Sequence, residues 1–260
     1  ARRVALSATV ADVDAYRAWL APDGDINAVT SVLGEAGADP NVTILIPEGR
    51  IPWSGHSGKY AAPQVMAEIA RRQTTLVFCN TRGLAELIFQ ELWSANDDNL
   101  PIAIHHGSLS VEARRKVEGA MAEGRLRALV ATASLDLGVD WDNVDCVIQM
   151  GAPKGSSRLL QRIGRANHRL DSASEAIVIP GNRFEYLEAR AALDAVEAGE
   201  RDADDFRAGS LDVLAQHVFG AACSAPFNAD ILYKEVTTAW PYKELTRDDF
   251  DSVVQFVQDG

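Results

Sequence analysis

The chain has 260 residues, of which 47% are hydrophobic and 24% are charged, and its formal net charge is −12. Its length exceeds the usual size of one domain, so we expect one large domain with parts of others. The sequence has no run of about 18 apolar residues and no secretory signal pattern, which excludes a membrane span and predicts a protein of the cytoplasm. Three widely spaced cysteines are typical of reduced thiols.

The negative charge is concentrated in the C-terminal third of the chain. Residues 1–170 hold 18 basic and 19 acidic side chains, a net charge of −1, whereas residues 171–260 hold 7 basic and 18 acidic ones, a net charge of −11. A strongly acidic protein is a poor partner for nucleic acid, because phosphate binding needs Lys and Arg. Residues 1–170 can still bind nucleic acid, because a nearly neutral domain can contain a locally positive cleft.

Apolar runs along the chain predict strands, and the stretches between them predict helices. Residues 1–20 contain a strand end, RVALSATV, and a short helix reaching Trp19, while residues 21–60 are interpreted as a linker with one edge strand, VTILIP. Further strands are predicted at 75–80, 102–106, 128–132, 144–150 and 176–179, with helices at 84–93, 111–123 and 158–165. Because these strands are apolar throughout, they indicate a parallel sheet with helices on both faces.

A second, mainly helical module is predicted after residue 182. An Ala-rich helix at 184–199 is followed by the acidic stretch ERDADDFRAG and by three short helices at 211–223, 230–239 and 247–258. Small polar side chains precede two of the predicted helices and are expected to cap them: Ser110 for the helix at 111–123 and Thr246 for the last helix.

Five clusters of polar and small residues stand close after predicted strands, where ligands bind in parallel sheets. The clusters are residues 7–9, 80–82, 106–108, 131–140 and 161–168. Hydroxyl groups and glycines there allow a phosphate to approach closely. Arg162, Arg165 and Arg169 are three or four residues apart, so a helix would place them on one face, which suits polyphosphate. Alternatively, that face is a solvated surface paired with Asp171 and Glu175.

The other clusters have structural alternatives as well. The residues at 80–82 are as well explained by an N-cap for the following helix. Trp53 and Trp93 are interpreted as aromatics that pack in the core or the linker, in preference to base-stacking platforms. The adjacent His105 and His106 lack the spacing of a zinc pair, so no metal site is expected.

In their joint order and spacing, these motifs resemble the second half of a superfamily 2 helicase motor. Motif III has its counterpart in LSAT, motif IV in TLVFCNTR, the next nucleic-acid-contact motif in IHHGSLS, motif V in LVATASLDLGVDW and motif VI in QRIGRANH. The sequence around the motifs resembles the Lhr-type branch, above all its bacterial ligase-associated DEXH-box members. The stretches that carry this similarity are PEGRIPWSGHSGKYA, LVFCNTRGLAELIFQELW and VIQMGAPKGSSRLLQRIGRANHR. The similarity continues through LDVLAQHVFGAAC into a winged-helix-like module.

The resemblance implies an α/β fold, in which a RecA-like parallel sheet with helices on both faces is followed by a partial, mainly helical winged-helix module. It divides the chain into four parts: the end of a first RecA-like domain at 1–20, a second RecA-like domain at 21–182, a connector helix at 183–208 and a partial winged-helix domain at 209–260.

The resemblance also implies a role for each motif residue, because in this family ATP lies between two RecA-like domains and single-stranded nucleic acid crosses both. The implied strand contacts are Thr81, Arg82, His106, Gly107 and Thr132. The implied ATP-binding residues are Gly138, Asp140 and Arg162. The implied catalytic residues are Arg165 as an arginine finger, Gln161 and His168, and the implied coupling residues are Ser7 and Thr9. His168 stands where many relatives have a second finger, so either His168 or Arg169 would replace that arginine.

Most ligands of ATP and Mg²⁺ are expected on a first RecA-like domain, because this chain has neither G-x-x-x-x-G-K-[ST] nor a DEXH box. We therefore expect the chain to begin inside a longer gene product and to be unable to hydrolyse ATP alone. The expected partners are that domain, single-stranded or partly duplex DNA in a bacterial cytoplasm, and a DNA ligase or repair nuclease. Two alternatives stay open: a nucleic-acid-binding or annealing module without motor activity, and an RNA helicase, since phosphate contacts do not distinguish RNA from DNA.

Overall fold

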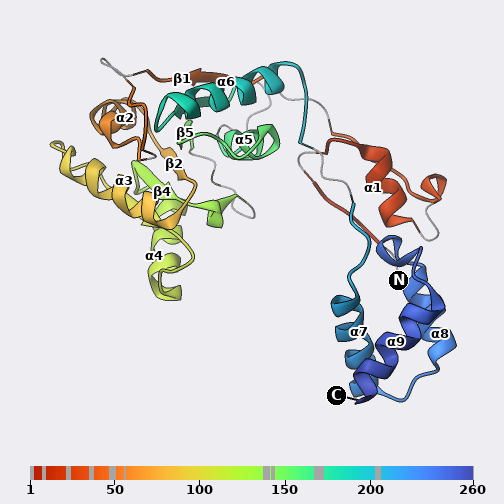
Figure 1. The fold of residues 1–260 in the computed structure, drawn as a ribbon. Coiled ribbons are helices and arrows are strands. Elements are labelled where there is room, and N and C mark those ends of the chain that lie inside the picture. Colours follow the sequence, from red (N-terminus) through yellow and green to blue (C-terminus); the bar gives the residue numbers. More distant parts are fainter. Residues whose placement is uncertain are drawn as a thin grey trace. The chain divides into compact units, whose positions relative to one another are not determined.

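The computed structural model describes residues 3–7, 10–21, 25–34, 38–46, 51–55, 57–136, 141, 144–166, 173–202 and 206–259. The chain divides into two compact units. The sheet unit comprises residues 35–202, and the helical unit combines residues 1–34 with residues 203–260 (Figure 1).

The described residues of the sheet unit contain a parallel sheet of six strands in the order β1-β6-β5-β2-β4-β3. The strands are β1 (Asn41–Ile44), β2 (Thr75–Cys79), β3 (Ile102–His105), β4 (Ala128–Ala131), β5 (Cys146–Met150) and β6 (Glu175–Ile179). Strands β2, β4 and β5 are buried along their whole length, which explains their unbroken apolar sequences. In the edge strand β1 exposed and half-buried residues alternate, as the linker sequence predicts.

Helices cover both faces of the sheet, as predicted. They are α2 (Ala62–Ala70), α3 (Arg82–Ser94), α4 (Val111–Ala122), α5 (Ser156–Ile163) and α6 (Arg183–Glu197), with short 3-10 turns η3 (Lys59–Ala61) and η4 (Ala133–Leu135). On one face α2 and α3 pack against Val77 of β2, and on the other α5 and α6 pack against Leu76 and Phe78. Successive residues of β2 therefore pack into the cores on opposite faces of the sheet, which requires an apolar side chain at every position.

The helical unit contains α1 (Val13–Leu20), η2 (Ile26–Ala28), α7 (Leu211–Ser224), α8 (Ala229–Thr237), η5 (Trp240–Tyr242) and α9 (Arg247–Asp259). Its core contains Leu214 and Val218 of α7 together with Phe250 of α9. Helix α1 joins this unit through aromatic contacts, since Tyr16 packs edge-on against Phe206 at 4.9 Å between ring centroids. In the part of the chain that the structure describes, no helix is long and apolar enough to cross a membrane.

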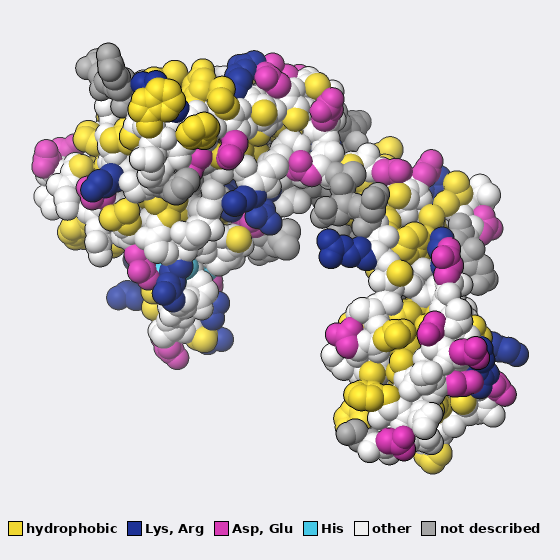
Figure 2. Space-filling model, in the orientation of Figure 1, with side chains coloured by type: hydrophobic (Ala, Val, Ile, Leu, Met, Phe, Trp, Pro, Cys, Tyr) yellow, Lys and Arg dark blue, Asp and Glu magenta, His cyan; other side chains and the backbone are white. Residues whose placement is uncertain are grey.

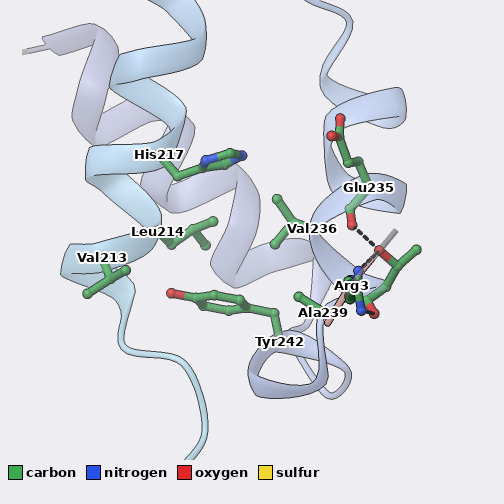
Figure 3. Close-up of a pocket in the computed structure, with 9 residues that line it drawn as sticks. Arg3, Val213, Leu214, His217, Glu235, Val236, Ala239 and Tyr242 are labelled. Carbon is green, nitrogen blue, oxygen red and sulfur yellow. Dashed lines mark hydrogen bonds between the residues drawn. The ribbon is translucent and has the colours of Figure 1, made fainter. Parts of the chain in front are cut away.

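A cavity of about 510 Å³ opens between α7 and α8 in the helical unit (Figure 3). Leu214 and His217 of α7 face Val236 of α8 and the ring of Tyr242 across it. Arg3 lines the same cavity, and its Nη1 donates to the backbone oxygen of Leu20 at 3.2 Å. Arg3 therefore belongs to the framework of this unit.

The predicted helix caps are confirmed. The Oγ of Ser110 accepts a hydrogen bond from the amide of Ala113 at 3.1 Å, and the Oγ1 of Thr246 accepts one from Asp249 at 3.1 Å. Each satisfies an amide that the first turn of a helix leaves without a partner, which stabilises the helix by about 1 kcal/mol.

Two local predictions are wrong. The strand end expected in RVALSATV does not form in its described part, residues 3–7 and 10, because no strand pairs with it and the Leu6 side chain is exposed. Helix α5 runs from Ser156 to Ile163 instead of from 158 to 165, so Arg165 lies beyond its end. This second difference changes the candidate site.

Candidate nucleotide and nucleic-acid interface

The candidate site lies at the edge of the sheet where the parallel strands end. The register aligns Phe78 of β2 with Ala131 of β4 and Gln149 of β5, and aligns His105 of β3 with Ala131. The residues that follow these four strands are therefore brought to one edge. Motifs that stand far apart in the sequence meet there, as the sequence predicts for a parallel sheet.

Asp136 is the centre of an arginine cluster at this edge. Its Oδ1 accepts a hydrogen bond from the Nε of Arg162 at 2.9 Å, and its Oδ2 lies 3.8 Å from the Nε of Arg158. Its backbone oxygen accepts a hydrogen bond from the Nη2 of Arg165 at 2.8 Å. One residue of the stretch that resembles motif V thus fixes three arginines from α5 and the turn after it.

The guanidinium of Arg162 is buried, and its remaining partners come from two other strand ends. Arg162 is only 1% exposed, and its Nη1 donates to the Oε1 of Gln149 at 2.5 Å and to the Oδ1 of Asn80 at 3.3 Å. Its Cζ lies 4.8 Å from the centre of the Phe78 ring. A buried charge needs such partners, because burial without them is strongly unfavourable. Arg162 therefore ties the ends of β2 and β5 to Asp136.

The structure does not place Arg162 and Arg165 on one exposed helix face. Arg162 lies on the face of α5 that also carries Leu159 and Ile163, both buried against the sheet, because residues three or four apart share a face. Arg165 follows the end of the helix and is half-buried. The alternative of a solvated, paired face also fails for Arg162, and Glu175 pairs instead with Arg72.

The residues expected to contact the strand lie at the ends of β2, β3 and β4. The Oγ1 of Thr81 accepts a hydrogen bond from the amide of Leu84 at 3.2 Å, so the predicted alternative of an N-cap is confirmed for it, although the residue stays exposed. The Nη1 of Arg82 donates to the Oγ of Ser108 at 3.1 Å. This contact joins the motif IV residues to the turn that contains the exposed Gly107.

The two histidines of this edge are both buried. The Nε2 of His106 lies 3.5 Å from a carboxylate oxygen of Glu86. His105 contacts the Oγ of Ser134 at 2.9 Å through Nδ1 and the Oε1 of Glu118 at 3.0 Å through Nε2. His105 thereby holds the turn after β4 against α4, which places the half-buried Thr132 beside the end of β3.

A cavity of about 410 Å³ lies beside the N-terminal turn of α3. Its lining residues are Ser57, Asn80, Thr81, Gly83, Leu84, Leu87, Gly151, Lys154 and Glu185. The carboxylate of Glu185 accepts hydrogen bonds from the amides of Gly181 at 2.8 Å and Ala152 at 3.2 Å. These bonds satisfy one carboxylate oxygen of Glu185, and Lys154 is the cationic side chain in the lining that an anionic group could pair with.

Six residues that the sequence predictions name lie outside the described residues: Thr9, Gly138, Asp140, His168, Arg169 and Asp171. Ser7 is exposed in the helical unit, and Gln161 is half-buried on α5. No group of three acidic, histidine or cysteine side chains within the described ranges is placed to hold a metal ion.

The sequence assigned no role to Asp136, Gln149, Glu185 or Lys154, although Asp136 lies within the cluster at 131–140. One signal for Asp136 was present, because it is an acidic residue in a mostly small and apolar stretch, two residues before Gly138. The partnership with Arg162 was hidden by their separation of 26 residues.

Comparisons with known proteins find two domain families along the chain. Residues 59–169 match the helicase conserved C-terminal domain, and residues 194–260 match the winged helix domain of large helicase-related protein. The ATP-dependent helicase Lhr-Core of Methanocaldococcus jannaschii is 38% identical over 74% of this chain and 23% of its own length. The Lhr helicase/uracil glycosylase of Escherichia coli K12 is 31% identical over 99% of this chain and 20% of its own.

A solved structure of Mycobacterium smegmatis helicase Lhr, bound to ssDNA and AMP-PNP, matches with a TM-score of 0.85 at 29% identity, over 95% of this chain and 33% of that one. The chain thus spans between 20% and 33% of the length of these three relatives. It belongs to the Lhr-type superfamily 2 helicases, of which it is a C-terminal RecA-like domain followed by winged-helix sequence.

Proposed function

We propose that the chain is the C-terminal motor region of an ATP-dependent DNA helicase or translocase, which binds single-stranded DNA and supplies an arginine finger to ATP hydrolysis. The observation that carries this proposal is the network centred on Asp136. It connects Asn80, next to the strand-contacting residues, with Arg165, which the family resemblance assigns to the nucleotide. A motor needs such a connection, because its grip on the strand must follow the state of its nucleotide.

Arg165 is the arginine finger in this proposal. A backbone carbonyl holds its guanidinium in place, so the positive charge is positioned before charge develops on the γ-phosphate. Gln161 and His168 act beside it, and Gly138 and Asp140 face the nucleotide. Arg162 is too deeply buried to reach ATP without a rearrangement, so we assign it to positioning Arg165. ATP and Mg²⁺ take most of their ligands from a first RecA-like domain.

Single-stranded DNA follows the carboxyl edge of the sheet in this proposal. Arg82, Gly107 and Thr132 contact its backbone, with His106 next to Gly107 contacting it only after its buried side chain leaves Glu86. A phosphate occupies the cavity that Thr81 and Lys154 line. Amides at a helix N-terminus and a nearby cation attract phosphate without reading the bases, which a protein that steps along a strand requires. M. smegmatis helicase Lhr was solved with ssDNA and AMP-PNP, the two kinds of ligand that we propose for this chain.

Strand displacement on matched DNA and RNA duplexes tests this function. The protein should contain this chain together with a first RecA-like domain, and it should receive ATP and Mg²⁺. Displacement of DNA with ATP turnover stimulated by single strands is the expected result. Displacement of RNA alone would favour the RNA helicase, and binding or annealing without ATP turnover would favour a module without motor activity.

Partners beyond DNA follow from the resemblance to the ligase-associated branch. We propose a DNA ligase or a repair nuclease as the partner of the full-length protein in a bacterial cytoplasm. Co-purification of either from cells that express the tagged full-length protein, after nuclease treatment to remove bridging DNA, is the test.

A further inference from the structure

Trp53 is exposed on the sheet unit, contrary to its prediction as a packing aromatic. Its exposed fraction is 66%, although tryptophan is usually well buried on average. The guanidinium carbon of Arg183 lies 4.1 Å from the centre of the ring, a cation–π contact. Phe184, the next residue of α6, is exposed as well. In Figure 2 hydrophobic and basic side chains adjoin on the surface where β1 and α6 lie in Figure 1.

Hydrogen bonds fix the segment that carries Trp53 to the start of α6. The Nε of Arg183 donates to the backbone oxygen of Ile51, and its amide donates to that of Pro52, both at 3.1 Å. The Nδ2 of Asn182 donates to the backbone oxygen of Gly55 at 2.6 Å. A ring held in this way loses little conformational entropy when it binds a ligand.

Close sequence neighbours of Trp53 and Arg183 line the cavity that we assign to a strand phosphate. Ser57 lines that cavity and follows Trp53 by four residues, and Glu185 lines it from α6, two residues after Arg183. Lys154 provides a cation in the same cavity. We therefore expect a strand with one phosphate beside Lys154 to place a neighbouring base within reach of Trp53.

We propose that Trp53, held by Arg183, is a stacking platform for a base of single-stranded DNA, an inference that rests on the proposed function. A ring next to a cation stacks on any base, because every base has a π face, so the contact is independent of sequence. Arg183 also places a positive charge near the phosphates. Both properties suit a strand that must move through the site.

Trp93 provides the matched control. Its exposed fraction is 60%, close to that of Trp53, but it lies at the C-terminal end of α3 and packs on Phe89 of the same helix. Thr81 caps the opposite end of that helix, about 18 Å away at 1.5 Å per residue. The Trp93→Ala variant therefore removes an indole that is about as exposed as Trp53. In the proposal this indole lies outside the path of the strand.

The experiment uses a protein that contains this chain together with its first RecA-like domain. It measures the affinity of that protein for single-stranded oligonucleotides that are intact or have one abasic position. Trp53→Ala should weaken binding of the intact oligonucleotide by about 5- to 100-fold, Trp53→Phe should restore most of it, and Trp93→Ala should change nothing. Scanning the abasic position should reveal one site where the loss weakens wild type but has little effect on Trp53→Ala.

Two outcomes would overturn the inference. Equal affinities of folded Trp53→Ala and Trp93→Ala variants would show that no base stacks on Trp53. A loss of affinity in Trp53→Ala with no abasic position that couples to it would mean that the ring contacts protein instead. A wild-type protein that binds no single-stranded DNA would refute the proposed function itself, whereas wild-type binding that is insensitive to Trp53 refutes the platform alone.

Discussion

The Asp136→Asn substitution is the sharpest test of the network, because it removes a charge and keeps the shape of the side chain. Arg162 stays buried and charged, and the oxygens of Gln149 and Asn80 remain its partners. Loss of one partner from a buried ion pair destabilises a protein by about 3–5 kcal/mol, and the remaining polar partners favour the lower end of this range. A loss of about 3 kcal/mol lowers the Tm of a domain of this size by roughly 6–12 °C.

Thermal and urea denaturation measure this loss, with Asp194→Asn as the control. Asp194 also pairs with an arginine, Arg190, but both side chains are about half exposed, so the same change should leave stability almost unaffected. In the protein with its first RecA-like domain, Asp136→Asn should also slow ATP turnover by about 10- to 100-fold, because weaker binding of Arg162 shifts the backbone at residue 136, whose oxygen holds Arg165. Asp136→Asn and Asp194→Asn variants of equal stability would refute the account of Asp136.

The remaining predictions concern the thiols, the pH dependence and the chain by itself. Burial raises the pKa of the Cys79 and Cys146 thiols to about 12, so at pH 8 iodoacetamide should label only the exposed Cys223 until the protein is unfolded, and mass spectrometry detects this; early labelling of either buried thiol would contradict it. A hydrogen bond from Arg247, together with its charge, lowers the pKa of Asp230, so its contribution to the stability of the helical unit is full above the unfolded pKa of about 3.9 and is lost as the pH falls through the folded pKa. Urea titrations of wild type and an Asp230→Asn variant should therefore differ at pH 6 and converge in acid; a constant difference would contradict this. The purified 260-residue chain should not hydrolyse ATP in a phosphate-release assay with single-stranded DNA, and robust turnover would refute this prediction.

The fold was predictable because its main features are local. Unbroken apolar runs such as that of β2 occur where helices cover both faces of a strand, and Ser110 and Thr246 cap helices that follow them directly. The association of α1 with the helical unit was not predictable, since it depends on a contact between Tyr16 and Phe206, which are far apart in the sequence.

The site was predictable in its location but not in its internal contacts. A parallel sheet brings its strand ends together, so the motifs were expected to meet at one edge. The buried position of Arg162 was missed because arginine is rarely fully buried, although Leu159 and Ile163 mark the same face of α5 as apolar. Exposure of Trp53 was missed for the opposite reason, because tryptophan usually packs and the partner Arg183 lies 130 residues later.

The Arg165→Ala substitution tests the central claim most directly, in the protein that joins this chain to a first RecA-like domain. ATP turnover and affinity for single-stranded DNA are measured on the same preparation, and Arg125→Ala, which removes an exposed arginine, is the control. The account predicts a fall of about 10³–10⁵ in ATP turnover, with DNA affinity within a few-fold of wild type. Unchanged turnover, or an equal loss of turnover and DNA affinity, would contradict the assignment of Arg165 as the arginine finger.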